Sequence, residues 1–360
     1  MGLKITKVSA MPVQLPLVKP IASALGRYTH VDCLVVRVHT ADGPTGTGFS
    51  GGLGSEASRA MPPYIEAELT PRIIGQDALS PDALWHMMWA PNKPRLRAGI
   101  AAWALSAIDI ALWDIVAKAA GLPLITLLGG FRRTVPVYGS GGWHTLSDAE
   151  LIEEAQSFVA QGITAYKYKT GTNRDRARTE LLRRELGDDV TLLADANQRF
   201  NVRKAIEHSR MLADYGVAWL EEPVLADTID DLAEVADNSA IPVAAGENAY
   251  FRWEFREIVE RRAAAYLQPD VGRVGGVSEF RRVAALADAF NLSLSSHLWH
   301  ELSISLVGAS PVGYMCEYVE LIPPGTLTRE FPVVDGAIEV PDVAGHGVEF
   351  TEDALQRFAL

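Results

Sequence analysis

The chain has 360 residues, of which 48% are hydrophobic and 22% are charged, so it can bury a large core and is not a disordered protein. Its length exceeds that of an average domain and predicts either two domains or one large barrel with an attachment. The 45 acidic residues outnumber the 33 basic ones, and the net charge of -12 repels nucleic acid and anionic lipid. We therefore expect neither nucleic acid nor a membrane as a partner.

Two further features concern the cellular compartment. The N-terminal residues lack the unbroken apolar core of a signal peptide, and we expect no membrane span because no apolar run reaches roughly 18 residues. The two cysteines, Cys33 and Cys316, lie inside apolar runs and are too few for a disulfide framework. These features predict a cytoplasmic protein.

Residues 1–130 predict an α+β domain in which strands come first and helices follow. Alternating apolar residues near the N-terminus indicate strands, and Ala-Asp-Gly at 41–43 supplies the chemistry of a hairpin turn. Helices are expected over 55–69, from Pro81 onward, and over the long apolar segment 100–120.

A glycine-rich segment follows the expected hairpin. Its Gly46-x-Gly48-x-x-Gly51 pattern fits the dinucleotide fingerprint formally, but it spans a hairpin strand and does not open a crossover helix. We expect Gly51, Gly52 and Gly54 to form a mobile loop over the mouth of the second domain.

From Thr134 onward, short apolar strands alternate with longer amphipathic segments, which is the pattern of repeated βα units. Eight parallel strands predict a (β/α)8-type barrel over residues 131–322, with functional residues where the strands end. The predicted strands begin near residues 135, 165, 191, 217, 242, 265, 292 and 314. We expect the proline-rich tail, residues 323–360, not to continue the barrel and to pack back on the first domain.

Ionisable residues recur at the ends of these strands, where a strand buried on both faces should be apolar. Because one βα unit separates each from the next, all of them should converge on one mouth of a closed barrel. The series consists of Lys169, Asp195, Glu221, Glu247, Asp270, His297 and Glu317.

Three members of the series predict a metal site. Asp195, Glu221 and Glu247 offer hard oxygen ligands from adjacent strands, which suits Mg2+ with open positions for substrate and water. The segment from His297 to Glu301 reads HxxHE and matches neither HExxH nor HxxEH, so we expect no zinc motif there. His300 is expected to begin a helix or to line the pocket.

Other members predict acid and base chemistry. Lys167 and Lys169 share one face of a strand, and their proximity and burial should leave one of them neutral enough to act as a base. Asn197 shares a face with Asp195 and could contact a substrate oxygen. Asp270 should fix the tautomer of His297, which would make His297 a second base. The chain has no GxSxG elbow, which argues against an acyl hydrolase.

Taken in order, these motifs resemble the mandelate racemase subgroup of the enolase superfamily over nearly the whole chain. They are KYK at 167–169, DAN at 195–197, EEP at 221–223, GEN at 246–248, Asp270, SSHL at 295–298 and Glu317. The resemblance implies an N-terminal α+β capping domain over 1–130 and a modified (β/α)7β barrel over 131–322. It also implies that a C-terminal segment over 323–360 completes the cap, and that the chain forms an even-numbered homo-oligomer.

The resemblance also implies roles for the residues. Asp195, Glu221 and Glu247 would bind Mg2+, Lys169 would be one base, and His297 with Asp270 would be the other. Lys167 would hold the substrate carboxylate. Glu317 would be a protonated acid that donates a hydrogen bond to that carboxylate, which requires a raised pKa.

This inventory serves two reactions of a small-molecule carboxylic acid through an enolate, or ene-diolate, intermediate. Bases on opposite faces of the alpha carbon would racemise a 2-hydroxy acid, which we rank first, whereas loss of a beta-hydroxyl would dehydrate an acid sugar. An apolar wall would favour the racemase, and it would consist of Ile21, Leu25, Tyr28, Leu298, Trp299 and Val319. Polar residues would favour an acid sugar, and the candidates are Arg27, His30, Trp143 and His144. A non-catalytic barrel is the remaining alternative.

Overall fold

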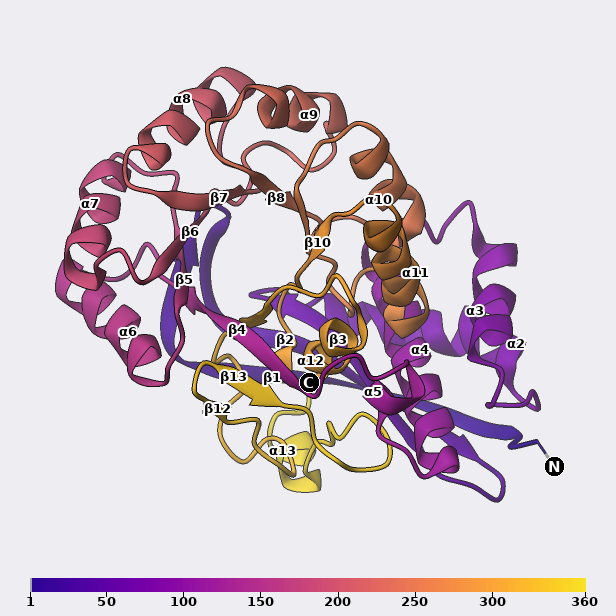
Figure 1. Ribbon diagram of the computed structural model, residues 1–360. Coiled ribbons are helices and arrows are strands. Elements are labelled where there is room, and N and C mark those ends of the chain that lie inside the picture. The colour runs from indigo at the N-terminus through magenta and orange to yellow at the C-terminus, as the bar shows by residue number, and fades with distance from the viewer. Residues whose placement is uncertain (1) are drawn as a thin grey trace.

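The computed structural model describes residues 2–360. Figure 1 looks along the axis of the second domain, where the helices curve around the strands, and the helices of the N-terminal domain lie to one side. This arrangement is the α/β barrel with an N-terminal α+β domain that the sequence predicts.

The N-terminal domain is built on one antiparallel sheet in the order β1-β2-β3. Its strands are β1 (Ile5–Ser23), β2 (Gly26–Thr40) and β3 (Gly46–Leu53). Short helical segments follow, namely η1 (Ala57–Ala60), α1 (Met61–Tyr64), η2 (Ile65–Leu69), α2 (Thr70–Ile73), α3 (Pro81–Trp89) and η3 (Ala90–Asn92). The helices α4 (Gly99–Ala120) and α5 (Leu124–Leu127) complete the domain.

The glycines of β3 have a packing role that the sequence interpretation missed. A Cβ atom at Gly46 would lie 2.0 Å from the carbonyl oxygen of Ala111, and one at Gly48 would lie 1.9 Å from that of Ala107. The missing side chains therefore let helix α4 approach the strand closely. The expectation of a mobile glycine loop was wrong for Gly51 and Gly52, because both belong to the strand and are buried.

Helix α4 is long and apolar enough to cross a membrane by length and composition alone. The expectation that no run reaches that length was therefore wrong. In the fold, however, 78% of its most apolar 18-residue window is buried, because β3 covers one face of the helix and barrel helix α11 (Gly276–Ala289) covers another. It is the central helix of the N-terminal domain, and Gly121 ends it in the left-handed conformation.

The barrel contains the eight strands that the sequence predicts. They are β4 (Thr134–Gly141), β5 (Ala165–Lys169), β6 (Thr191–Asp195), β7 (Val217–Glu221), β8 (Val243–Ala245), β9 (Tyr266–Leu267), β10 (Ser293–Leu294) and β11 (Cys316–Tyr318). The remaining helices outside them are α6 (Asp148–Ala160), α7 (Asp175–Leu186), α8 (Val202–Ala213), α9 (Ile229–Asn238), α10 (Phe251–Glu260) and α12 (His300–Ala309). Strands β4 to β10 pair in parallel with their sequence neighbours, and β11 pairs with β4.

The strands β10 and β11 meet at a weaker seam. A single parallel bridge joins Leu294 to Gly313, and the amide of Tyr314 donates to the carbonyl of Leu294 over 2.7 Å. Below the mouth, apolar side chains fill the barrel interior. This inner cluster consists of Tyr138, Ala165, Leu193, Trp219, Ala244 and Met315.

The C-terminal segment departs in part from expectation. It contains β12 (Val333–Val334), β13 (Ala337–Glu339) and α13 (Glu352–Arg357). Strand β13 pairs antiparallel with β4, so the tail does extend the barrel sheet. After β13 the chain returns to the N-terminal domain, where Lys118 forms an ion pair with Glu349 over 2.5 Å.

Candidate active site

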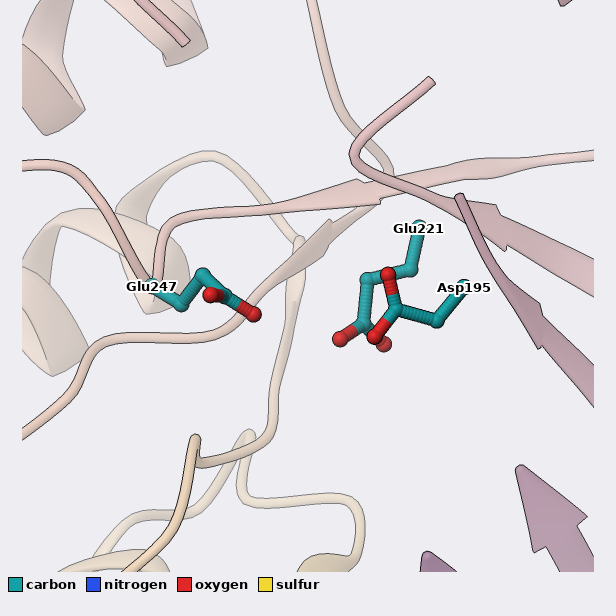
Figure 2. Close-up of side chains that lie close together, drawn as sticks. All are labelled: Asp195, Glu221 and Glu247. Atoms are coloured by element: carbon teal, nitrogen blue, oxygen red, sulfur yellow. The ribbon is translucent and has the colours of Figure 1, made fainter. Parts of the chain in front are cut away.

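Three carboxylates gather at the carboxyl ends of β6, β7 and β8. One oxygen each from Asp195, Glu221 and Glu247 lies within 4.8 Å of the others, and all three side chains are buried. Figure 2 shows the three carboxylates pointing toward a common space from three strand ends. They meet because Asp195 and Glu221 are aligned in register on neighbouring parallel strands.

Both lysines of β5 reach this group. Lys167 donates to Glu221 over 2.6 Å and lies 2.7 Å from Oε1 of Glu317. Lys169 donates to Oδ2 of Asp195 over 2.5 Å, and its ammonium lies 5.0 Å from the centre of the Trp143 ring. Lys167 also lies 3.7 Å from Oδ2 of Asp195, so the two lysines share this carboxylate.

The electrostatics of the lysines differ from the sequence expectation. Burial lowers the pKa of Lys169, but Asp195, Glu221 and Glu317 together raise it by more, so the pKa lies above its ordinary value. The pKa of Lys167 is also raised, because Glu221 and Glu317 outweigh burial. The prediction that proximity makes one lysine neutral was wrong, because each ammonium has a carboxylate partner.

His297 and Asp270 form a hydrogen-bonded pair on the other side of the mouth. Nδ1 of His297 lies 2.7 Å from Oδ2 of Asp270, whose Oδ1 accepts from the amide of Gly272. Nε2 of His297 is thereby directed to the triad and lies 3.4 Å from Oε2 of Glu247. Burial lowers the pKa of His297, but Glu247 and Asp270 raise it above its ordinary value despite the opposing charge of Arg273.

Glu317 is placed as expected, but its surroundings shift its pKa in the direction opposite to the implied role. Its Oε2 accepts from the amide of Leu298 over 2.7 Å, and its Oε1 contacts Lys167. Burial raises the pKa of Glu317, but Lys167 and His297 hold it well below the usual range. The expectation of a raised pKa was therefore wrong, because the ammonium of Lys167 directly faces the carboxylate.

Several residues just after the strands have left-handed backbone. The φ angles are +42° at Asn197, +40° at Glu222, +47° at Leu298 and +48° at Trp299. Each such conformation costs about 1–3 kcal/mol in a non-glycine residue, and such strain concentrates at functional sites. The turns set the directions of the side chains at the barrel mouth.

Two residues that the sequence interpretation did not single out support this group. Gln268 donates to Oε2 of Glu221 over 2.7 Å from within the barrel. Arg273 lies 3.4 Å from Oδ2 of Asp270 and donates to the carbonyl of Glu247 over 3.2 Å. Gln268 lies two residues before Asp270, and Arg273 lies three residues after it. This closeness in sequence to a predicted site residue was the signal that could have identified them.

The predicted apolar wall forms only in part. Ile21, Leu298 and Val319 are buried, whereas Leu25 is 58% exposed at the tip of the β1–β2 hairpin. Trp299 packs on Phe49 with ring centres 5.2 Å apart, so it joins the core between the domains. The wall prediction therefore fails for Leu25, because it lies in a turn, and for Trp299, because the N-terminal domain covers it.

The polar candidates near the mouth have distinct positions. Tyr28, which was predicted to belong to the apolar wall, directs its hydroxyl to Oγ of Ser23 at 3.3 Å. His144 joins the hairpin to the barrel, since its amide donates to the carbonyl of Ala22 over 2.8 Å. His30 contacts the carbonyl of Ser55, and Arg27 is exposed.

His300 matches the expectation of a helix start. It is the first residue of α12, and it is buried beside Tyr318.

The residues at the mouth fit a divalent cation. The donor set consists of three carboxylates, which are hard oxygen ligands of the kind Mg2+ prefers. Oδ1 of Asn197 is buried beside Asp195 without a hydrogen-bond partner in the described chain. An added cation or substrate group would satisfy this orphaned acceptor.

The fold and the site together define a metal-dependent barrel enzyme with a lysine and a histidine–aspartate pair facing each other across a carboxylate triad. The model for the mandelate racemase/muconate lactonizing enzyme N-terminal domain matches residues 5–129, and that for the enolase C-terminal domain-like family matches 150–354. The chain belongs to this family of the enolase superfamily.

Named relatives include enzymes of several kinds. A 3,6-anhydro-alpha-L-galactonate cycloisomerase from Streptomyces coelicolor is 33% identical over 94% of both chains. An L-talarate/galactarate dehydratase from Salmonella typhimurium is 33% identical over 94% of this chain and 87% of its own. An enolase from Bradyrhizobium, solved with magnesium and mandelic acid, superposes with a TM-score of 0.92 at 30% identity, covering 100% and 99% of the two chains. These similarities support a magnesium-dependent enolase-superfamily mechanism.

Proposed function

We propose that this protein removes the proton alpha to the carboxylate of a polyhydroxy acid and expels an oxygen substituent from the beta carbon. The observation that carries the proposal is the placement of Lys169 and His297 on opposite sides of the carboxylate triad. Such a placement provides one group to remove a proton and a second to donate one.

In this reaction, Asp195, Glu221 and Glu247 would hold Mg2+, which supplies positive charge to the dianion that forms when the alpha proton leaves. Asp195 would then share its charge with the cation, so Lys169 would lose part of the interaction that raises its pKa. Lys167 and Asn197 would orient the substrate carboxylate, and Lys169 would take the alpha proton.

His297 would complete the elimination. The electron pair of the broken C–H bond forms a double bond between the alpha and beta carbons, and the beta C–O bond breaks. The Nε2 proton of His297 passes to the departing oxygen, which leaves as water from a hydroxyl substituent. Asp270 would stabilise the imidazolium from the Nδ1 side before that transfer. The resulting enol becomes a 2-keto acid.

Two observations support elimination over the racemisation that we ranked first from the sequence. The apolar wall loses Leu25 and Trp299, and Tyr28 carries a hydroxyl that contacts Oγ of Ser23. The cycloisomerase and the dehydratase with which the chain shares 33% identity are named for sugar acids. Racemisation of a 2-hydroxy acid is the second candidate, because the same two bases serve it and the Bradyrhizobium structure holds mandelic acid.

The test is a panel of acids supplied to the magnesium-loaded enzyme. Aldonates and aldarates should release 2-keto acids, whereas mandelate and lactate have no beta-oxygen to lose and report racemisation by polarimetry. Exchange of the alpha proton in D2O, followed by NMR, detects the first step in either case. Rapid racemisation of mandelate with no keto acid from any sugar acid would replace the first candidate by the second.

A further inference from the structure

Glu222 is a deeply buried carboxyl group that the proposed mechanism does not use. It directly follows the metal ligand Glu221 and is only 3% exposed. Its Oε1 accepts from Nδ2 of Asn248 over 2.8 Å, and its Oε2 accepts from Nε2 of Gln198 over 3.4 Å. Burial of a carboxyl group is costly unless donors surround it, so these two amides allow Glu222 to be buried.

Asn248, the residue after the metal ligand Glu247, uses both ends of its side-chain amide. Its Nδ2 donates to Glu222, and its Oδ1 accepts from the guanidinium of Arg273 over 3.2 Å. A reversed amide would place donor against donor at Arg273 and acceptor against acceptor at Glu222, so chemistry fixes this orientation. Asn248 therefore connects Glu222 to Arg273.

The chain of contacts continues to His297. The guanidinium of Arg273 lies 3.4 Å from Oδ2 of Asp270, and the same oxygen lies 2.7 Å from Nδ1 of His297. Four residues form this chain beyond the catalytic groups, and we call them the outer belt: Gln198, Glu222, Asn248 and Arg273. Each of them follows a metal ligand or Asp270 by one or three residues. The outer belt therefore spans the ends of β6, β7, β8 and β9.

A cavity of about 520 Å³ lies against the outer belt. Gln198, Glu222 and Asn248 all line this cavity, so close packing does not hold their side chains on that side. Their hydrogen bonds must therefore fix their positions. Loss of one bond should let the neighbouring side chains shift toward the cavity.

We propose that Glu222 and Asn248 are positioning residues for His297. Through Arg273, they would keep the His297–Asp270 pair at a fixed distance from the metal ligands. Protonation of the departing oxygen requires accurate placement of His297, because an error of about 1 Å can cost about 100-fold in rate. Lys169 lies on β5 and pairs with Asp195, so removal of the alpha proton should depend less on the outer belt. This inference rests on the proposed function for its effect on the reaction.

The experiment replaces Asn248 in the magnesium-loaded enzyme. We expect Asn248→Ala to lower keto acid release from sugar acids by about 10-fold, and to lower alpha-proton exchange in D2O by less than about threefold. In an Arg273→Met background, the same change should lower keto acid release by less than about twofold further, because Asn248 acts through Arg273.

Variants of Glu222 give an independent comparison. Glu222→Leu removes both acceptor oxygens and should reduce keto acid release as Asn248→Ala does. Glu222→Gln retains an oxygen that can accept from Asn248, so it should preserve most of the product formation. Asp227→Asn is the matched control, because it removes a charge from an exposed position in the same loop after β7, and it should change neither rate.

A spectroscopic measurement tests the inference without the reaction. The ring protons of His297 are followed by NMR in protein labelled with 15N-histidine, and His297→Asn assigns their signals. Asp270 protects the proton on Nδ1 from water. We expect this proton to exchange with water at least about fivefold faster in Asn248→Ala, because the pair is held less firmly.

The outcomes separate this inference from the proposed function. Equal losses of alpha-proton exchange and product in Asn248→Ala, or unchanged exchange of the Nδ1 proton in that folded variant, would overturn the positioning role. If Asn248→Ala does not fold, the comparison of Glu222→Leu with Glu222→Gln decides in its place. If the Nδ1 proton exchanges faster but no acid yields a keto acid, the positioning role stands and the proposed reaction fails.

Discussion

The guanidinium of Arg273, in the loop after β9, stacks over the ring of Trp103 on helix α4 at 5.4 Å. Arg273 belongs to the barrel and Trp103 to the N-terminal domain, so this contact joins the two at the active site. The same guanidinium reaches Asp270 and Glu247. Docking of the N-terminal domain therefore also positions the His297–Asp270 pair.

We expect Arg273→Met to separate removal of the alpha proton by Lys169 from the later loss of the beta-oxygen, which needs His297. Loss of the guanidinium should misplace Asp270 and His297, and it should lower keto acid formation by about 10- to 100-fold. Exchange of the alpha proton through Lys169 should fall much less, because Lys169 lies on β5 and does not contact Arg273. Arg273→Lys should restore part of the product formation. Equal losses of exchange and product in both variants would indicate general structural damage instead.

The metal site gives a second prediction. Glu221→Gln or Glu247→Gln should weaken magnesium binding, measured by calorimetry, and should reduce turnover by about 10- to 100-fold. Glu153→Gln, which removes the same charge from the surface, should change neither quantity. Full activity after exhaustive chelation, with metal analysis showing an empty protein, would refute a metal-dependent mechanism.

The third prediction separates the two bases in D2O. Lys169→Met should abolish alpha-proton exchange of the substrate that the enzyme dehydrates, because it removes the proposed base. His297→Asn should retain exchange but lose product, because the departing oxygen no longer receives a proton. Magnesium binding to each variant serves as the control for an intact site. Product formation at the wild-type rate by either variant would contradict the assignment.

Asp109 gives a prediction about stability and pH. It is buried on α4 and accepts two hydrogen bonds from Ser278 of α11, and burial raises its pKa to about 7. Between its ordinary pKa and about 7, the unfolded chain ionises while the folded chain stays protonated. Its contribution to the free energy of unfolding should therefore fall as pH rises, by about 1.4 kcal/mol per pH unit within this window.

Urea unfolding of Asp109→Asn provides the measurement. The asparagine stays neutral, so the variant should gain stability relative to the wild type by roughly 2 kcal/mol between pH 5 and pH 7. A difference between the two proteins that does not change with pH would show that Asp109 titrates at the same pH in the folded and unfolded chains.

Much of the barrel could be predicted from the sequence because two local patterns agree there. Apolar strands such as 191–195 alternate with amphipathic helices, and each strand ends in an ionisable residue. Register between parallel neighbours then brings Asp195 and Glu221 together without further information. The three-carboxylate group could therefore be predicted from the order of the strands alone.

Features that depend on contacts between distant segments could not be read in this way. The glycines at 46 and 48 look like loop residues until α4 is seen to lie against them. The burial of Trp299 depends on Phe49, 250 residues earlier in the chain. Protonation states were also missed, since the pKa of Glu317 depends on which cation lies opposite it.

The two ends of the chain are held together in the folded protein. The amide of Gln14 donates to the carbonyl of Phe358, and the amide of Leu360 donates to the carbonyl of Pro12. A chain still attached to the ribosome cannot form these bonds until residue 360 has left the exit tunnel. Strand β1 therefore lacks these hydrogen bonds until the entire barrel has been synthesised. During that time we expect chaperones to encounter an N-terminal sheet that is incompletely paired.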